Sequence, residues 1–368
     1  MRKTRVNLGD RSYEIMICRN ETAKLGRIIK QLDLGTDAVI ITNSRVKKLF
    51  GPGVKKSLLS AGLNVRFEIV PDSEAAKSEK HCLRLLNRIS RFDGLGRRVF
   101  IVALGGGVIG DLAGFVASIY KRGVPYAQVP TTLLAQVDSS IGGKVAIDLD
   151  IGKNLAGSFY QPRLVYSDVS FLKKLPEKEL ASGLAEVIKY GVIKSAALFS
   201  FIRKNLKKIL RRDPAVLERV VYECGSIKAG VVEKDERDNK DARIILNFGH
   251  TVGHAIETAA GYGKRYNHGQ AIALGMLAAS FISIKLNLLA EADYLKIRAL
   301  IKNSGLPVAL KGVSEGKIMR ALGHDKKFIR GKNRFVLPVS IGETVIKENI
   351  PESLIRGSIK TLYGLKKR

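Results

Sequence analysis

The chain has 368 residues, 45% of them hydrophobic and 26% charged, which is a globular composition long enough for about two domains. It contains no run of about 18 apolar residues, and its first residues lack the apolar stretch of a signal peptide, so we expect neither a membrane span nor a secretory signal. The formal net charge of +29 is spread along the whole chain without interleaved aromatic residues, which favours a solvated basic surface over nucleic-acid binding.

A positive charge of this size is also compatible with two further origins. Charge-rich surfaces are common in proteins from hot environments. A positive field also attracts a substrate that carries several negative charges. The three cysteines, Cys18, Cys82 and Cys224, are odd in number and far apart. They therefore predict free thiols in a reducing cytoplasm rather than a disulfide framework.

The first half of the chain alternates short β-rich runs with helical stretches, which is typical of a parallel sheet covered by helices. A hairpin is expected over residues 4–17. The predicted strands that follow are Ala38–Thr42, Val65–Val70, Val99–Leu104, Ala127–Val129 and Leu164–Tyr166.

From Pro176 to Gly305 the pattern is that of successive amphipathic helices, one of them beginning at Asp213-Pro214. Phe335–Val339 and Glu343–Glu348 predict a second hairpin. We therefore expect an α/β, Rossmann-like parallel-sheet domain over 1–172 and a mainly helical domain over 173–368, with a ligand cleft between them.

A glycine-rich turn follows the predicted strand at Val99–Leu104. Gly105, Gly107 and Gly110 satisfy G-x-G-x-x-G in a strand–turn–helix context. Glycines there let the backbone approach a pyrophosphate at a helix N-terminus. Residues 122–137 contain no acidic partner for a ribose, so this is not an ordinary dinucleotide fingerprint. A turn that merely packs helix on strand accounts for the pattern equally well.

Small and polar side chains are concentrated in residues 130–154, and they predict a loop shaped around a ligand. Lys144 follows two glycines and suits a phosphate as a point charge. A polar surface loop is the alternative. The segment includes Thr131, Thr132, Asp138, Ser139, Ser140, Lys144, Lys153 and Asn154.

Three of the five histidines, His250, His254 and His268, lie close together in the sequence. The first two are four residues apart and share one face of a predicted helix. Two histidines with a carboxylate form a common ligand set for zinc or a similar ion. Spacing alone leaves open which two histidines bind, and Glu186 and Glu257 are both candidates for the carboxylate.

Several long motifs, taken together and in order, resemble the 3-dehydroquinate synthases, a family of sugar phosphate cyclases. The resemblance runs from about residue 37 to residue 338. It rests on GGGVIGDLAGF, KRGVPYAQVPTTLLAQVDSSIGGKVAID, GKNLAGSFYQP, GLAEVIKYG, RIILNFGHTVGHAIE and HGQAIALGM.

The resemblance implies two cofactors. A divalent metal, zinc or cobalt, would be held by Glu186, His250 and His268, whereas His254 would lie by the substrate phosphate. NAD would be bound by a larger set of residues. They are Glu74, Lys77, Gly105, Gly106, Gly107, Asp111, Thr131, Thr132, Lys144 and Lys153.

The substrate implied by the resemblance is 3-deoxy-D-arabino-heptulosonate 7-phosphate, a small phosphorylated sugar acid. The reaction would combine NAD-dependent oxidation, phosphate elimination, reduction and an intramolecular aldol cyclisation that gives 3-dehydroquinate, the second step of the shikimate pathway. The matching catalytic residues are Lys144, Lys189, Lys228, Arg243, Asn247 and His254. The matching substrate-binding residues are Arg122, Asp138, Asn154 and Lys327. The family also implies a homodimer.

Two positions depart from the family pattern. Asn43 replaces an aspartate that would accept hydrogen bonds from the cofactor ribose, and the segment 236–242 is one residue longer than usual. Another sugar phosphate cyclase, such as 2-deoxy-scyllo-inosose synthase, is the main rival function. A metal-dependent alcohol dehydrogenase and a basic nucleic-acid-binding protein are weaker rivals.

Overall fold

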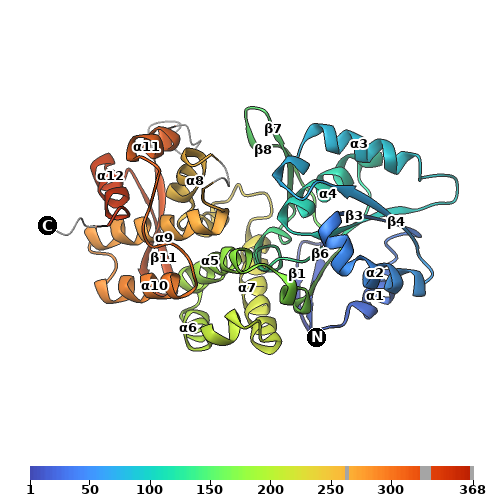
Figure 1. Cartoon of the computed structure of the whole chain (residues 1–368), viewed down its shortest axis with the longest axis horizontal. Helices are drawn as coiled ribbons and strands as arrows, with labels where there is room; N and C mark the ends of the chain where they lie inside the picture. The colour runs from blue at the N-terminus through green and yellow to red at the C-terminus, as the bar shows by residue number, and fades with distance from the viewer. Residues whose placement is uncertain (262–264, 324–332, 365–368) are drawn as a thin grey trace. The chain divides into compact units, whose positions relative to one another are not determined.

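The computed structural model describes residues 1–261, 265–323 and 333–364 (Figure 1). The chain forms two compact units: Met1–Leu175 with Arg212–Arg237, and Pro176–Arg211 with Asp238–Arg368. The first break lies close to the boundary expected at residue 172. Helix α7 (Pro214–Lys234) nevertheless belongs to the first unit, because it packs against strands β1 and β2 there. None of the described helices combines the length and the apolar character that a membrane crossing needs.

The first unit contains a seven-stranded sheet in the order β1-β2-β9-β6-β5-β3-β4. All neighbours run parallel except β1 and β2, which form the predicted N-terminal hairpin. The strands are β1 (Arg2–Val6), β2 (Tyr13–Cys18), β3 (Asp37–Asn43), β4 (Asn64–Val70), β5 (Val99–Gly105), β6 (Tyr126–Pro130) and β9 (Leu164–Asp168). The parallel-sheet fold class is therefore confirmed.

Apolar residues on both faces of the strands create two cores. Ala38 and Ile40 of β3 pack with α1 (Leu25–Gln31) and α2 (Ser44–Ser60) on one face. Val39 and Ile41 pack with α3 (Glu79–Ser90) and α4 (Gly107–Ile119) on the other. This alternation follows from the two-residue period of a strand, and burial of both faces is typical of parallel sheets.

The order of the strands reverses between β3 and β5. From β3 the chain passes to β4 on one side, and then returns to place β5 on the other side. In open α/β sheets, ligands bind outside the carboxyl ends of the strands at such a switch point. Asn43 ends β3 and Gly105 ends β5, so these two residues mark that edge.

The segment 130–154 is more regular than the predicted loop. It contains a π-helical turn, Ala135–Ser139, and the first half of a hairpin formed by β7 (Lys144–Leu149) and β8 (Gly152–Phe159). Val145 and Ile147 are buried, and both pack against α4 on the sheet's second core. The alternation of apolar and polar residues in KVAIDL is typical of a strand, but the glycines and polar residues around it favour a loop.

The second unit is mainly helical, as predicted. Its elements are α5 (Glu177–Lys194), α6 (Ala196–Leu210), α8 (His250–Ala259), α9 (His268–Lys285), α10 (Glu291–Asn303), α11 (Glu315–Gly323), α12 (Glu352–Thr361) and the hairpin β10 (Arg334–Ser340) with β11 (Glu343–Glu348). Helix α9 is buried over most of its length and contacts α5, α8, α10 and α12. An apolar helix of this kind is the core of its unit.

Candidate active site

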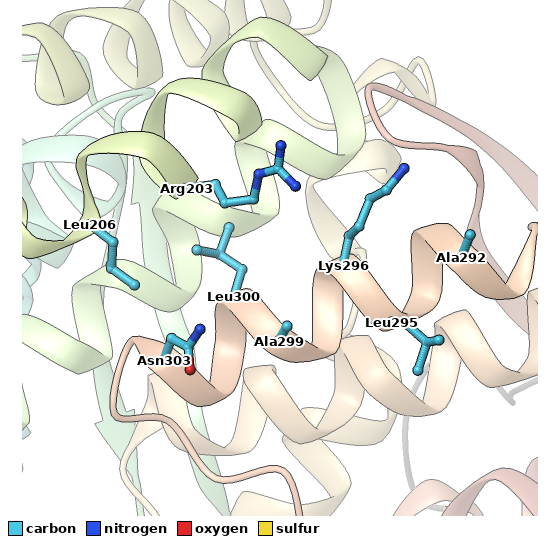
Figure 2. Close-up of a pocket in the computed structure, with 8 residues that line it drawn as sticks. All are labelled: Arg203, Leu206, Ala292, Leu295, Lys296, Ala299, Leu300 and Asn303. Atoms are coloured by element: carbon cyan, nitrogen blue, oxygen red, sulfur yellow. The ribbon is translucent and has the colours of Figure 1, made fainter.

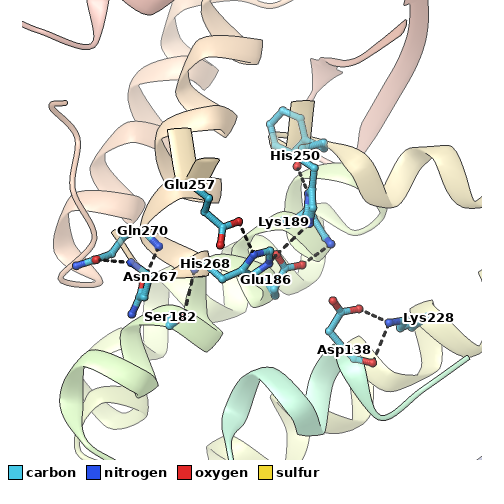
Figure 3. A network of polar contacts seen from close by, with 12 residues as sticks. Asp138, Ser182, Glu186, Lys189, Lys228, His250, Glu257, Asn267, His268 and Gln270 are labelled. Atoms are coloured by element: carbon cyan, nitrogen blue, oxygen red, sulfur yellow. Dashed lines mark hydrogen bonds and ion pairs between the residues drawn. The ribbon is translucent and has the colours of Figure 1, made fainter. Parts of the chain in front are cut away.

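Three helices of the second unit each contribute one side chain to a buried cluster of potential metal ligands. Glu186 lies in the middle of α5, His250 is the first residue of α8, and His268 is the first residue of α9 (Figure 3). The start of α9 is fixed by a capping box, in which Asn267 and Gln270 exchange side-chain and backbone hydrogen bonds. The start of α8 follows Gly249, which has a left-handed φ of 79°.

The spacing of the donor atoms fits one divalent cation. Oε1 of Glu186 lies 3.6 Å from Nε2 of His250 and 3.5 Å from Nε2 of His268. Ligands about 2.1 Å from a tetrahedral zinc are separated from one another by about 3.4 Å. All three donor atoms lie within 4.8 Å of one another. The cluster therefore has the ligand chemistry and the spacing that a zinc or cobalt site requires.

The second nitrogen of each imidazole faces an acceptor. Nδ1 of His250 lies 3.2 Å from the carbonyl oxygen of Phe248, and Nδ1 of His268 lies 3.2 Å from Oε2 of Glu257. If each Nδ1 carries the proton, each Nε2 keeps its lone pair for a cation. Glu257 thus contacts the ring nitrogen of His268 that faces away from Glu186.

Lys189 is an ion-pair partner of Glu186. The two side chains are three residues apart on α5, form an ion pair through Oε2 of Glu186, and are both fully buried. The two carboxylate oxygens of Glu186 therefore have different partners, with Oε1 toward the histidines and Oε2 toward Lys189.

The electrostatics of the two histidines differ. Burial, reinforced by the positive charge of Lys189, lowers the pKa of His250 well below its usual value. Burial also lowers the pKa of His268, but hydrogen bonds and negative charge from Glu186 and Glu257 outweigh it and raise the pKa to about 10. His250 is therefore neutral near pH 7, as a metal ligand must be, and a cation at His268 would have to displace a proton.

The structure places three further predicted residues in this unit. The ring of His254 lies 5.1 Å from that of His250 and 6.0 Å from that of His268. Arg243 is 4% exposed and Asn247 is half-buried, both in the turn Ala242–Asn247 before α8. Lys327 lies outside the described residues.

The predicted nucleotide residues gather at the carboxyl edge of the sheet in the first unit. Gly105 ends β5, Gly106 and Gly107 open α4, and Thr131 and Thr132 follow β6. The backbone N–H of Thr131 donates to the carbonyl of Gly105 over 2.9 Å, which ties the two turns together. Such an edge, with a helix N-terminus pointing at it, is suited to a pyrophosphate.

Packing also requires two glycines of this motif. A Cβ at Gly105 would lie 2.6 Å from Ile109, and one at Gly110 would lie 2.8 Å from Gln128. A Cβ at Gly107 would meet the Ser139 hydroxyl at 3.0 Å. The packing explanation of the glycine-rich turn is therefore supported, and pyrophosphate binding at the start of α4 stays a prediction.

Lys77 joins three segments of the first unit. Its ammonium donates to Asp111 of α4 over 2.8 Å and to the side chain of Asn154 on β8. Lys153, beside Asn154, forms a 3.2 Å ion pair with Glu74. Five residues predicted separately from the sequence thus form one connected polar cluster. Asp148, which the sequence reasoning missed, belongs to it by accepting the backbone N–H of Asn154 over 2.9 Å.

The remaining predicted residues of this unit lie on other segments. Lys228 of α7 donates to the backbone carbonyl of Asp138 over 2.8 Å and forms an ion pair with its carboxylate (Figure 3). Lys144 opens β7 and is exposed. Arg122 is exposed, with a left-handed φ of 64°.

A separate hollow of about 320 Å³ lies between α6 and α10 (Figure 2). None of the predicted site residues lines it. Its walls are aliphatic and cationic and carry no cluster of titratable groups suited to catalysis. The lining residues are Arg203, Leu206, Ala292, Leu295, Lys296, Ala299, Leu300 and Asn303.

Asn43 has a structural role that the sequence did not reveal. Its side-chain oxygen accepts the backbone N–H of Val46 over 2.8 Å and so caps α2. Its amide nitrogen donates to Asp72 over 2.7 Å. An aspartate at this position could cap the helix but would repel Asp72, so asparagine suits this pair of segments.

Comparison with known proteins finds matches along most of the chain. The family profiles described as 3-dehydroquinate synthase N-terminal and C-terminal match residues 67–182 and 183–328. The chain is 47% identical to 3-dehydroquinate synthase of Desulforamulus reducens, with 95% of this chain and 96% of that one covered. It is 46% identical to that of Thermodesulfovibrio yellowstonii, with 95% and 97% covered.

A solved structure of 2-deoxy-scyllo-inosose synthase complexed with carbaglucose-6-phosphate, NAD+ and Co2+ is similar with a TM-score of 0.88 and 27% identity, covering 97% of this chain and 99% of that one. An iron-containing alcohol dehydrogenase, at 16% identity and a TM-score of 0.69, shares the fold alone. Sequence identity to the 3-dehydroquinate synthases is higher than to these two proteins and extends over nearly the full length, so the chain belongs to the 3-dehydroquinate synthase family.

Proposed function

We propose that this protein converts 3-deoxy-D-arabino-heptulosonate 7-phosphate to 3-dehydroquinate and phosphate, with NAD and a divalent metal ion as cofactors. It belongs to a family of lyases. The observation that carries the proposal is the convergence of Glu186, His250 and His268 at the separations expected of ligands around one cation.

Glu186, His250 and His268 would hold the cation, which acts as a Lewis acid that lowers the pKa of a bound sugar hydroxyl. The buried Lys189 forms an ion pair with Glu186 and so helps to orient that carboxylate. His254 is exposed at the same cluster, where it can contact a ligand. In this arrangement the protein supplies position and charge.

NAD, the hydride acceptor, would lie at the carboxyl edge of the sheet, on Gly105–Gly107 and beside Thr131 and Thr132. The Lys77 cluster, with Glu74, Asp111, Lys153 and Asn154, would border the same cofactor.

The substrate's carboxylate and phosphate call for cationic partners. Arg243 is a buried planar fork that matches a carboxylate, and Lys228 is a point charge held in place by Asp138. Lys144 and Arg122 would complete the anion-binding set, together with Asn247.

The direct test is to mix the purified protein with the heptulosonate phosphate and to measure phosphate and dehydroquinate, with and without added NAD, and after chelation and metal restoration. We expect equal amounts of the two products, loss of activity on chelation, and recovery with zinc or cobalt. Absence of turnover under all these conditions would exclude the proposal.

Glucose 6-phosphate serves as the second substrate in the same assay, because it lacks the carboxylate that Arg243 suits. Phosphate release from it instead of from the heptulosonate would favour a 2-deoxy-scyllo-inosose synthase. Net accumulation of NADH would favour a simple dehydrogenase, because the proposed reaction regenerates NAD.

A further inference from the structure

We infer that Glu257 is a positioning residue for the metal ligand His268, and that it sets the affinity of the site without touching the metal. The inference rests on the proposed metal site, and it concerns a side chain that the sequence left as an alternative carboxylate ligand.

The Glu257 carboxylate, the His268 imidazole and the candidate metal position follow one another in that order. Oε2 of Glu257 lies 3.2 Å from Nδ1 of His268, while Nε2 of the same ring lies 3.5 Å from Glu186 (Figure 3). The two nitrogens are on different edges of the ring. Glu257 therefore contacts His268 from the edge opposite the candidate cation.

The position of Glu257 on α8 connects two of the ligands. His250 opens α8, and Glu257 lies seven residues later, so two turns of helix place both side chains on one face. Helix α8 thus supplies one ligand directly and orients a second ligand that belongs to α9. This link between the helices helps to fix the ring of His268, whose side chain is 30% exposed.

A carboxylate at this point has two physical effects. It accepts a hydrogen bond from the Nδ1–H group and so favours the tautomer whose Nε2 lone pair is available to a cation. Its negative charge also makes the imidazole a stronger donor. The Glu257 side chain is only 13% exposed, so solvent screens this interaction less than it would at the surface.

Glu257 could instead be a ligand itself, because His254, Glu257 and His268 also place donor atoms within 4.8 Å of one another. That arrangement would use Nδ1 of His268. It would leave the fully buried Glu186 and its contact with His250 without a metal. The first cluster has the more buried ligands, so we assign Glu257 to the supporting role.

The test measures metal affinity and ligand field on the full chain. The variants are Glu257→Gln, which keeps the shape and an acceptor oxygen, and Glu257→Ala. Glu179→Gln is the matched control, because it removes a negative charge from an exposed position at the start of α5. Zinc affinity is measured by competition with a chromophoric chelator, and the Co2+ form is examined by visible absorption. Thermal melts without metal establish that each variant folds.

We expect one metal per chain in every one of these proteins. Affinity should fall by about 10- to 100-fold in Glu257→Ala, which is the usual effect of losing such a partner, and by less in Glu257→Gln. The Co2+ absorption bands should shift in both variants and stay unchanged in Glu179→Gln.

Two results would overturn the inference. Wild-type affinity and spectrum in Glu257→Ala would show that the contact is inconsequential, and complete loss of metal in Glu257→Gln would make Glu257 a ligand. A wild-type chain that binds no metal would reject the metal-dependent function, and this inference with it. If the wild type binds metal and the Glu257 variants have its affinity and spectrum, this inference is rejected and the proposed function is not. If Glu257→Ala fails to fold, Glu257→Gln carries the test.

Discussion

At the scale of single residues, the candidate site is governed by one fully buried carboxylate. Glu186 has no solvent exposure, and it forms an ion pair with the almost equally buried Lys189. Buried charges are costly unless they are paired and hydrogen-bonded. A cation held by Glu186, His250 and His268 would add a second positive partner, on the side of the carboxylate that faces the histidines.

Removal of either histidine ligand should therefore abolish metal binding and leave most of the fold intact. We expect His250→Ala and His268→Ala to retain less than about a tenth of the wild-type metal after dialysis, because two ligands hold an ion much more weakly than three. Metal analysis of the dialysed proteins measures this, with Glu179→Gln as the control. Full metal content in both variants would disprove the ligand assignment.

Glu186→Ala is less suitable, because it would leave Lys189 buried without its carboxylate. Losing one partner of such a pair costs about 3–5 kcal/mol. Loss of metal in that variant would therefore not separate a missing ligand from a damaged fold.

The cysteines give a second prediction at this scale. All three are buried, and burial raises the pKa of Cys18 to about 12 and that of Cys82 to about 11. A raised pKa lowers the thiolate fraction at a given pH, to roughly one in ten thousand for Cys18 at pH 8. We expect a disulfide reagent at pH 8 to label no thiol in the native protein within minutes.

The same reagent should label three thiols per chain after unfolding in guanidinium, which serves as the control. Rapid labelling of one thiol in the native state would show that its surroundings are less protected than the structure indicates.

The limits of sequence reasoning are clearest at the histidines. Clustering of His250, His254 and His268 was enough to predict a metal site, and only the family motif singled out two of the three. Which acceptor faces each Nδ1 could not be predicted. The carbonyl of Phe248 reaches His250 through the irregular turn before α8, and Glu257 reaches His268 only through the way α8 and α9 pack.

At the scale of elements, glycines of α9 let the three ligand-bearing helices approach one another closely. A Cβ at Gly269 would lie 2.2 Å from the carbonyl oxygen of Ser182 on α5. A Cβ at Gly275 would lie 1.9 Å from the carbonyl oxygen of Gly249, just before α8. No flexible side chain could move aside, since both obstacles are backbone atoms.

We therefore predict that Gly275→Ala separates α8 from α9, with a cost in unfolding free energy of about 3 kcal/mol. The displacement should also spread the histidines and weaken metal binding. Urea unfolding and metal affinity measure the two effects.

Gly357→Ala in α12 is the matched control, because a Cβ there meets nothing within 4 Å. It should leave metal binding unchanged and stabilise the protein by about 0.5–1 kcal/mol. Equal stability of the two variants would contradict the close approach at Gly275.

The elements also show where hydrophobic patterns suffice for prediction. Buried strands such as β3 and β5 were predicted to within a residue or two, because continuous apolar runs bounded by polar residues allow few alternatives. Strands β7 and β8 were missed because β7 is short and follows two glycines, and β8 itself contains glycines. They are held by pairing with each other and by packing on α4, neither of which is local in sequence.

At the scale of the whole molecule, the path of the chain differs from a simple division at residue 172. The chain forms α5 and α6 in the second unit and then passes back to the first unit, where it forms α7. Amphipathic periodicity predicted α7 and its start at Asp213, whose carboxylate caps the helix. Periodicity carries no information about which unit covers the apolar face, so the assignment to a unit required the structure.

The predicted metal ligands and the predicted NAD-binding glycines belong to different units, and this predicts where metal will stabilise the protein. All three candidate ligands belong to the second unit, on α5, α8 and α9. A ligand that binds only the folded form adds about 2.7 kcal/mol to the free energy of unfolding when its concentration is 100 times its dissociation constant. Amide exchange that requires unfolding of the binding site then slows about 100-fold. We therefore expect zinc to slow hydrogen exchange in these helices by up to that factor, and to leave β3 and β5 of the sheet largely unchanged.

Hydrogen–deuterium exchange of the chelated and the zinc-restored protein, resolved by peptide, measures this difference. His268→Ala is the control, because it retains the helices but should show no response to zinc. Slowing of equal size in the sheet and in the helices would mean that the two units open as one body. A response confined to the sheet would contradict the ligand assignment, because it would place the metal in the first unit. Glu186 and both histidines lie on helices of the second unit.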